Sequence, residues 1–211
     1  AKPVKEFRSV VNVKSGDSTQ ELRWLWPDAK LWDENSPHLY SLQLEAKAAS
    51  WGDEWRERFG FREFWIEGTQ FFLNGKPIRL RPQVAVDRWT NIGGVRVLIE
   101  ATMRAQQSVG YNCLELWPED YARPGQFEFF NLYRDFADRS GILLIDNWGH
   151  LGQFISGGDM VTMWQTPERR AAYERFARWE WRERRNHPSV VMFASSGNMF
   201  GHRQDQDPRT L

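Results

Sequence analysis

The chain has 211 residues, of which 41% are hydrophobic and 27% are charged, which is ordinary for a globular protein with a buried core. Its 28 Lys and Arg residues balance 28 Asp and Glu residues, so no net charge favours nucleic acid or an anionic membrane as a partner. The single cysteine, Cys113, excludes an internal disulfide framework. No apolar run approaches the roughly 20 residues of a membrane span.

Aromatic side chains are unusually frequent, at 15% of the chain, and include 12 Trp and 14 Phe. Two interpretations stay open at this point. The rings can simply fill a core, or some of them can also form a surface on which the C–H faces of a sugar stack.

The first third of the sequence predicts β-strands. Residues 5–15 ("KEFRSVVNVKS"), 38–48 ("HLYSLQLEAKA") and 55–68 ("WRERFGFREFWIEG") alternate apolar and polar side chains, as half-buried strands do. The stretches between them are rich in turn-forming residues. We therefore expect residues 1–68 to be the later part of an antiparallel β-sandwich, since a whole one takes about 100 residues.

From residue 69 the pattern changes to alternating strands and helices. Residues 70–83 predict a hairpin, because Asn74-Gly75 tolerates positive φ. Apolar strands and amphipathic helices then alternate, with strands at 111–117, 142–148 and 190–196 and helices at 95–110, 126–141 and 166–189. This order predicts a parallel sheet, and about four such units in residues 69–211 amount to half of a (β/α)8 TIM barrel.

The helix ends carry matching signals. Gly110 and Gly141 are suitable stops for the first two helices, and Thr166 followed by Pro167 is suitable to begin the third. The third helix holds many arginines balanced by glutamates such as Glu180. We interpret its charged side as the solvated outer face of the barrel rather than as a nucleic-acid surface.

Five short motifs in order carry a family resemblance. They are Trp32, Pro37, Leu39 and Tyr40; Gly60-Phe61-Arg62; Leu73 to Pro77; residues 108–116 with 136–146; and "NHPSVVM" at 186–192. Taken together they resemble glycoside hydrolase family 2, which includes β-galactosidases, β-glucuronidases, β-mannosidases and exo-β-glucosaminidases. The resemblance implies that residues 1–68 end an immunoglobulin-like domain and that residues 69–211 begin a TIM-barrel catalytic domain of a longer protein.

The resemblance also implies where the chemistry would lie. Retaining glycosidases use two carboxyl groups, one as acid/base and one as nucleophile. In the family the acid/base is a glutamate directly after an asparagine at the tip of the fourth barrel strand, which here are Met199 and Asn198. A thioether has no titratable proton, so Met199 cannot act as the acid. The family's nucleophile lies on a later strand, so we expect this chain alone to be inactive.

Other carboxyl groups could replace the missing acid. Glu115 stands inside an otherwise apolar strand, and Asp146 lies at the end of the next one. For each, the alternative is a structural role, as a partner of an arginine for Glu115 and as a hydrogen-bond acceptor for Asp146. The remaining acidic candidates after the strands fit solvated loops better, and these are Glu119, Asp120, Asp205 and Asp207.

Substrate binding is assigned to three residues. By the resemblance, the Asn198 amide binds the sugar hydroxyl next to the reacting carbon, although it could equally cap the strand. Trp117 and Trp148 close the second and third barrel strands, where they could form a stacking platform or pack beneath loops.

Three functions stay open. The first is a divergent glycoside hydrolase acting on β-linked glycosides, the second is a carbohydrate-binding pseudoenzyme, and the third is a structural subunit that keeps only the fold. The resemblance implies carbohydrate as the partner. No phosphate loop and no metal motif is present, so we expect no cofactor and no metal. A homo-oligomer through the longer chain stays open, and a periplasmic or extracellular location in a bacterium is favoured over a cytoplasmic one.

Overall fold

The computed structural model describes residues 3–12, 16, 18–48, 50–86, 96–117, 126–147 and 166–194. The chain divides into two compact units, Ala1–Lys30 and Leu31–Leu211. In the first unit, the Phe7 and Trp24 rings stack with their centres 5.0 Å apart. The strand expected over residues 5–15 is not formed within its described part, 5–12, because no neighbouring segment of this unit pairs with it there.

The second unit begins with a long antiparallel hairpin. Strand β1 (Tyr40–Ala48) pairs with β2 (Trp51–Phe59) in a continuous register from Tyr40↔Phe59 to Ala48↔Trp51. The strand predicted at 38–48 is therefore confirmed. The strand predicted at 55–68 is instead divided, since the backbone leaves the ladder at Gly60.

A three-stranded antiparallel sheet follows, formed by β3 (Phe64–Glu67), β4 (Gln70–Leu73) and β5 (Lys76–Ile78). Its second turn has positive φ at both central residues, 51° at Asn74 and 79° at Gly75. Positive φ at both positions is the requirement of a type I′ turn, so the predicted hairpin is confirmed. Asn74 also donates from Nδ2 to the Trp32 carbonyl at 2.9 Å.

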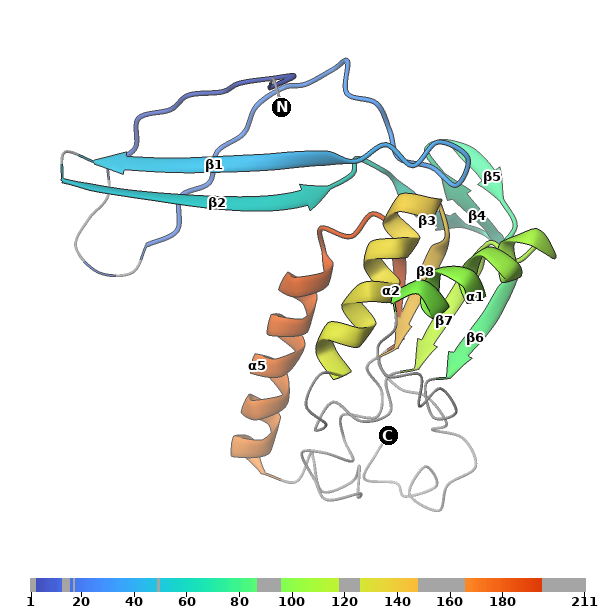
Figure 1. Cartoon of the computed structure of the whole chain (residues 1–211). Coiled ribbons are helices and arrows are strands. Elements are labelled where there is room, and N and C mark those ends of the chain that lie inside the picture. The colour runs from blue at the N-terminus through green and yellow to red at the C-terminus, as the bar shows by residue number, and fades with distance from the viewer. Residues whose placement is uncertain are drawn as a thin grey trace. The chain divides into compact units, whose positions relative to one another are not determined.

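The α/β part contains a four-stranded parallel sheet in the order β6 (Pro82–Val86), β7 (Cys113–Trp117), β8 (Leu143–Asn147) and β9 (Val190–Ala194). The helices α1 (Arg96–Ser108), α2 (Gln126–Ser140) and α5 (Pro167–Arg184) lie between these strands in the sequence. All three pairings are parallel and follow chain order, which confirms the predicted alternation. Figure 1 shows α1 and α2 lying against one face of this sheet.

The predicted helix signals also hold. Gly110 and Gly141 follow α1 and α2 with φ of 96° and 77°, in the left-handed region where helices commonly end. The Thr166 hydroxyl accepts a hydrogen bond from the Arg169 amide at 3.3 Å and so caps α5, with Pro167 in the first turn. Among the described helices, none combines the length and apolarity needed to cross a membrane.

Two apolar clusters hold the second unit together, one on each face of the parallel sheet. On the first face the buried side chains of β7 and β8, among them Leu114 and Leu144, pack against α1 and α2. On the other face Cys113 and Leu143 pack with Trp32 and Leu73 of the β-rich part. Because side chains alternate along a strand, a single β7 strand serves both clusters.

The joint between the β-rich and α/β parts uses residues of the family motifs. The Trp32 side chain is fully buried and donates from its indole nitrogen to the Asp138 carbonyl at 2.7 Å. Arg62 donates from Nε to the Pro188 carbonyl at 2.9 Å. Gly60 lies so close to Pro188 that a Cβ at residue 60 would come within 2.9 Å of the proline ring. These contacts lie at the starts of the parallel strands, and Figure 1 shows the arrowheads of β6, β7 and β8 pointing away from β3–β5.

The described fold is therefore β-rich in its earlier part and α/β in its later part, as predicted. The boundary between residues 68 and 69 stays a prediction, as do the immunoglobulin-like topology and the closed barrel. Residues on the two sides of that boundary share one sheet, since β3 pairs with β4 from Phe64↔Leu73 to Glu67↔Gln70.

Candidate functional site

The expected site lies at the carboxyl ends of the parallel strands, and the strand register determines which side chains share a face there. Glu115 of β7 lies between Val84 of β6 and Ile145 of β8, and Ile145 is followed by Met192 of β9. These four positions form one row across the sheet. Glu115 is the only titratable residue in that row.

The Glu115 carboxylate is on the sheet face opposite the helices. Leu114 and Leu116, its neighbours in the strand, belong to the cluster that packs against α1 and α2, so alternation places Glu115 on the other face, with Cys113. Glu115 is half-buried, and among the described residues no side chain forms a hydrogen bond or ion pair with it. Position and exposure together leave this carboxyl group available to a ligand at that face.

Cys113 lies two residues earlier in β7, on the same face of the sheet, and the charge of the Glu115 carboxylate affects its thiol. Its side chain is fully buried. Burial, and secondarily the negative charge of Glu115, raise the pKa of the Cys113 thiol to about 12. The thiol is therefore neutral at physiological pH and is not a nucleophile.

Asp146 has a different environment, because it points to the helix side of the sheet. Its Oδ2 accepts from Arg134 Nε of α2 at 2.7 Å, and its Oδ1 lies 3.1 Å from Arg184 NH1 of α5. All three side chains are fully buried. An aspartate enclosed by two arginines in this way has no path to a sugar, which matches the structural alternative for Asp146.

Sequence reasoning missed the other members of this buried charge cluster. Glu180 and Arg184 are fully buried and form an ion pair four residues apart along α5. The expectation that the charged side of this helix is entirely solvated is therefore wrong at these two positions. The signal that could have indicated Arg184 is a carboxylate at the end of an apolar strand, Asp146, which requires a buried cationic partner.

Most of the remaining predicted site residues lie outside the described residues. They are Trp148, Asn198, Met199, Glu119, Asp120, Asp205 and Asp207. Trp117 is the last residue of β7, and the structure describes its backbone but not its side chain. The roles given to these residues stay predictions.

One further cluster of possible ligand atoms lies at the joint with the β-rich part. Single ligand atoms of Asp135, Asp138 and His187 lie within 4.8 Å of one another. Asp138 is nevertheless fully engaged, since Oδ1 accepts from the Ser189 hydroxyl at 2.6 Å and Oδ2 lies 2.6 Å from His187 Nδ1. Asp135 pairs with Arg58 of β2. The cluster fixes the turn before β9 to α2, which gives His187 a structural role.

The chain resembles known proteins both in sequence and in fold. Residues 2–62 match the family model described as "Glycosyl hydrolases family 2". A β-glucuronidase from Streptococcus agalactiae is 28% identical over 193 residues, which is 87% of this chain and 31% of the relative. A β-galactosidase from Thermoanaerobacterium thermosulfurigenes is 25% identical over 183 residues, which is 85% of this chain and 23% of the relative. The chain thus spans about a third or less of the length of these curated relatives.

Solved structures agree on the fold. The crystal structure of Parabacteroides merdae β-glucuronidase superposes with a TM-score of 0.57 at 24% identity, covering 78% of this chain and 19% of that one. A β-glucuronidase from Ruminococcus gnavus, in complex with a C6-substituted uronic isofagomine, gives a TM-score of 0.61 at 22% identity, covering 81% of this chain and 28% of that one. The sequence matches thereby confirm the predicted resemblance to the family 2 glycosyl hydrolases, and the solved structures agree with it in fold.

Proposed function

We propose that this chain forms part of a glycoside hydrolase that acts on β-linked glycosides. One observation carries the proposal: two relatives named as β-glycosidases match 85% or more of the chain. A glycosidase also accounts for the aromatic composition, since sugar-binding clefts use tryptophan and phenylalanine faces.

The architecture that goes with this function is an immunoglobulin-like domain ending at about residue 68 and the first half of a TIM barrel from residue 69. The four parallel strands β6 to β9 in chain order support the second assignment, because consecutive parallel neighbours are what a barrel requires. Further strands of a longer chain would close the barrel and supply the nucleophile. On this proposal the 211 residues alone hydrolyse nothing.

The acid is assigned to Glu115, in place of the glutamate that Met199 replaces. Supporting this choice, Glu115 lies on the sheet face opposite the helices and is half-buried, whereas the other strand candidate, Asp146, is enclosed by Arg134 and Arg184.

The experiment measures release of aryl alcohol from a panel of aryl β-glycosides by the longer protein that contains this chain. We expect turnover in the unaltered protein and a loss of about 100-fold or more in kcat/KM for Glu115→Gln with a poor leaving group. With a dinitrophenyl leaving group, which needs little protonation, the loss in kcat/KM should be much smaller. Glu45→Gln, on the exposed strand β1, is the matched control and should leave both rates unchanged.

The leaving-group dependence is the decisive readout, because a purely structural glutamate would lower both rates equally. Equal loss for the two substrates would remove Glu115 from the acid role. Absence of turnover in the unaltered protein with every glycoside would reject hydrolysis altogether.

Met199 favours a second candidate, a carbohydrate-binding pseudoenzyme that retains Asn198, Trp117 and Trp148 for binding. Oligosaccharide binding measured by calorimetry, together with no turnover, would support it. If neither binding nor turnover is found, the structural subunit is the remaining function. A periplasmic or extracellular location and a homo-oligomer of the longer chain also stay predictions.

A further inference from the structure

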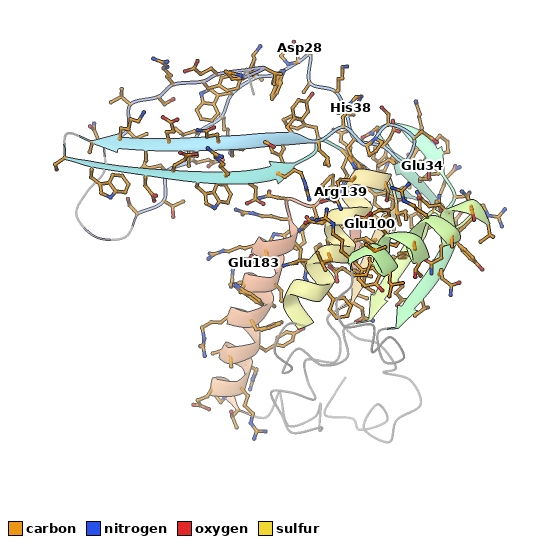
Figure 2. All side chains as sticks on the ribbon, viewed as in Figure 1. Asp28, Glu34, His38, Glu100, Arg139 and Glu183 are labelled. Carbon is orange, nitrogen blue, oxygen red and sulfur yellow. The ribbon has the colours of Figure 1, made fainter. Side chains whose placement is uncertain are left out.

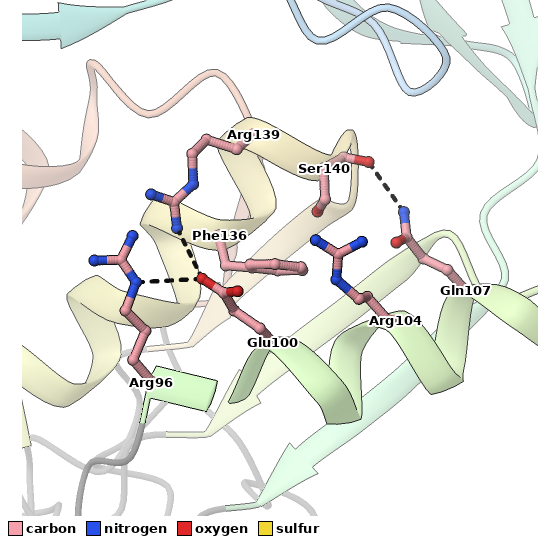
Figure 3. Close-up of a pocket in the computed structure, with 7 residues that line it drawn as sticks. All are labelled: Arg96, Glu100, Arg104, Gln107, Phe136, Arg139 and Ser140. Carbon is pink, nitrogen blue, oxygen red and sulfur yellow. Dashed lines mark hydrogen bonds and ion pairs between the residues drawn. The ribbon is translucent and has the colours of Figure 1, made fainter. Parts of the chain in front are cut away.

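A polar groove lies between α1 and α2, on the helix side of the parallel sheet. Its volume is about 460 Å³, and its lining residues are Arg96, Glu100, Arg104, Gln107, Phe136, Arg139 and Ser140. Figure 3 shows their side chains converging from the two helices. This volume falls within the range of about 300–1,000 Å³ that is usual for small-molecule sites.

The groove has a strong local excess of positive charge in a chain whose net charge is zero. Three arginines face a single glutamate, Glu100. Glu100 Oε1 is shared between Arg96 Nε at 3.2 Å and Arg139 NH2 at 3.4 Å, and Figure 2 shows Glu100 and Arg139 close together. Both contacts are long for charge-assisted hydrogen bonds, which usually measure about 2.7–2.9 Å. One carboxylate therefore satisfies neither arginine fully.

Arg104 is the third cation and has no carboxylate partner among the described residues. Its guanidinium carbon lies 5.5 Å from the centre of the Phe136 ring, which is 4% exposed. Stacking on an aromatic ring orients the planar guanidinium while leaving its N–H groups available at the edges. Gln107 donates to the Ser140 carbonyl at 3.0 Å and so holds α1 to the end of α2 beside the groove.

We propose that this groove binds a small ligand through an oxyanion, a phosphate or a carboxylate group, with Arg104 and Arg139 as its principal contacts. A guanidinium edge matches two oxygens of either group, and the arginines that line the groove outnumber its one glutamate. The groove is separate from the proposed glycosidase site, because α1 and α2 cover the Leu114 and Leu116 face of β7 and Glu115 lies on the other face. The inference therefore stands or falls independently of hydrolysis.

The test is calorimetric titration of the 211-residue chain with inorganic phosphate and, separately, with citrate, at constant pH and ionic strength. We expect one saturable site for at least one of the two anions, and the anion that binds distinguishes a phosphate from a carboxylate preference. Arg104→Ala should weaken binding about tenfold or more. Glu100→Gln should strengthen it severalfold, because it frees two arginines and removes a negative charge.

Arg56→Ala is the matched control, since Arg56 lies on β2, away from the groove, and forms a solvent-exposed ion pair with Glu54. It should bind like the unaltered chain, and circular dichroism should show the same helix content for all variants. The proposal is overturned if neither anion gives a saturable binding curve, or if Arg104→Ala and Arg56→Ala change the affinity to the same extent. It is also overturned if Glu100→Gln leaves the affinity unchanged.

Discussion

Gly141 lies against the backbone of Glu34, so closely that a Cβ at residue 141 would come within 2.2 Å of the Glu34 carbonyl oxygen. Its φ of 77° already disfavours any side chain. We therefore expect Gly141→Ala to destabilise the chain by more than 3 kcal/mol, as the sum of about 1–2 kcal/mol of backbone strain and a backbone clash that cannot relax locally.

Gly110 is the matched control for this prediction. It also ends a helix, with φ of 96°, but a Cβ there meets nothing within 4 Å. Gly110→Ala should therefore cost only the backbone strain, about 1–2 kcal/mol. Urea unfolding of the two variants measures the difference, and equal losses would show that the close approach to Glu34 contributes nothing.

The second prediction concerns the buried charged residues Arg134, Asp146, Glu180 and Arg184. Asp146→Asn keeps the shape of the side chain but leaves Arg134 and Arg184 buried without their shared counter-charge. We expect a loss of about 3–5 kcal/mol in the free energy of unfolding. Glu54→Gln, which breaks the exposed pair with Arg56, should cost less than about 1 kcal/mol.

The same pair of variants distinguishes a structural from a chemical role. If Asp146→Asn were as stable as the unaltered chain, the aspartate would not be a counter-charge, and a role in chemistry would return. Chemical denaturation at pH 7 is sufficient for this comparison.

The raised pKa of Cys113 predicts that the free energy of unfolding depends on pH in the alkaline range. Its pKa is raised from an ordinary value of 9.0 to about 12, chiefly by burial, so the neutral thiol stabilises the folded state. This contribution is complete below pH 9 and is lost as the pH rises from 9 toward 12, because only the unfolded chain has then released the proton. The slope is about 1.4 kcal/mol per pH unit.

Comparison with Cys113→Ala isolates this contribution from the other groups that titrate at alkaline pH. The stability difference between the two proteins should shrink steadily between pH 9 and pH 11. A difference that stays constant would contradict the raised pKa. In the folded chain at pH 8, a thiol reagent should react with Cys113 only at the rate of unfolding.

The cap of α5 can be tested with two substitutions. Thr166→Ala removes the acceptor for the Arg169 amide and should cost about 1 kcal/mol, whereas Thr166→Ser keeps the hydroxyl and should cost little. Glu168 reports on the same turn, because its own backbone amide and the Thr166 side chain lower the pKa of its carboxyl group. In Thr166→Ala this pKa should rise toward its ordinary value, as measured by NMR titration. An unchanged pKa would show that the threonine hydroxyl does not reach this turn.

Local signals were sufficient to predict most of the fold. Asn74-Gly75 requires a type I′ turn wherever it occurs between strands, and Gly110 and Gly141 end helices for reasons contained in their own backbones. The alternation of strands and helices then predicted the parallel order of β6 to β9 correctly, since the crossovers permit few other arrangements.

Features that depend on distant partners could not be predicted. At the break between β2 and β3, Gly60 lies against Pro188, and these residues are far apart in the sequence. Glu180 and Arg184 read as surface charges, because nothing in α5 itself indicates that Asp146 lies opposite them. For the candidate site, the sequence placed Glu115 on the second parallel strand, but only the core packing on either face of the sheet shows which way it points.

The joint formed by Trp32, Arg62 and Pro188 has an evolutionary consequence. It anchors the strands at their beginnings, while any sugar chemistry would take place at their opposite ends. The acid-to-thioether replacement that the sequence predicts at residue 199 would therefore leave these anchoring contacts unchanged. In such a scaffold, catalytic residues can be lost, moved or regained during evolution while the contacts that stabilise the fold stay the same.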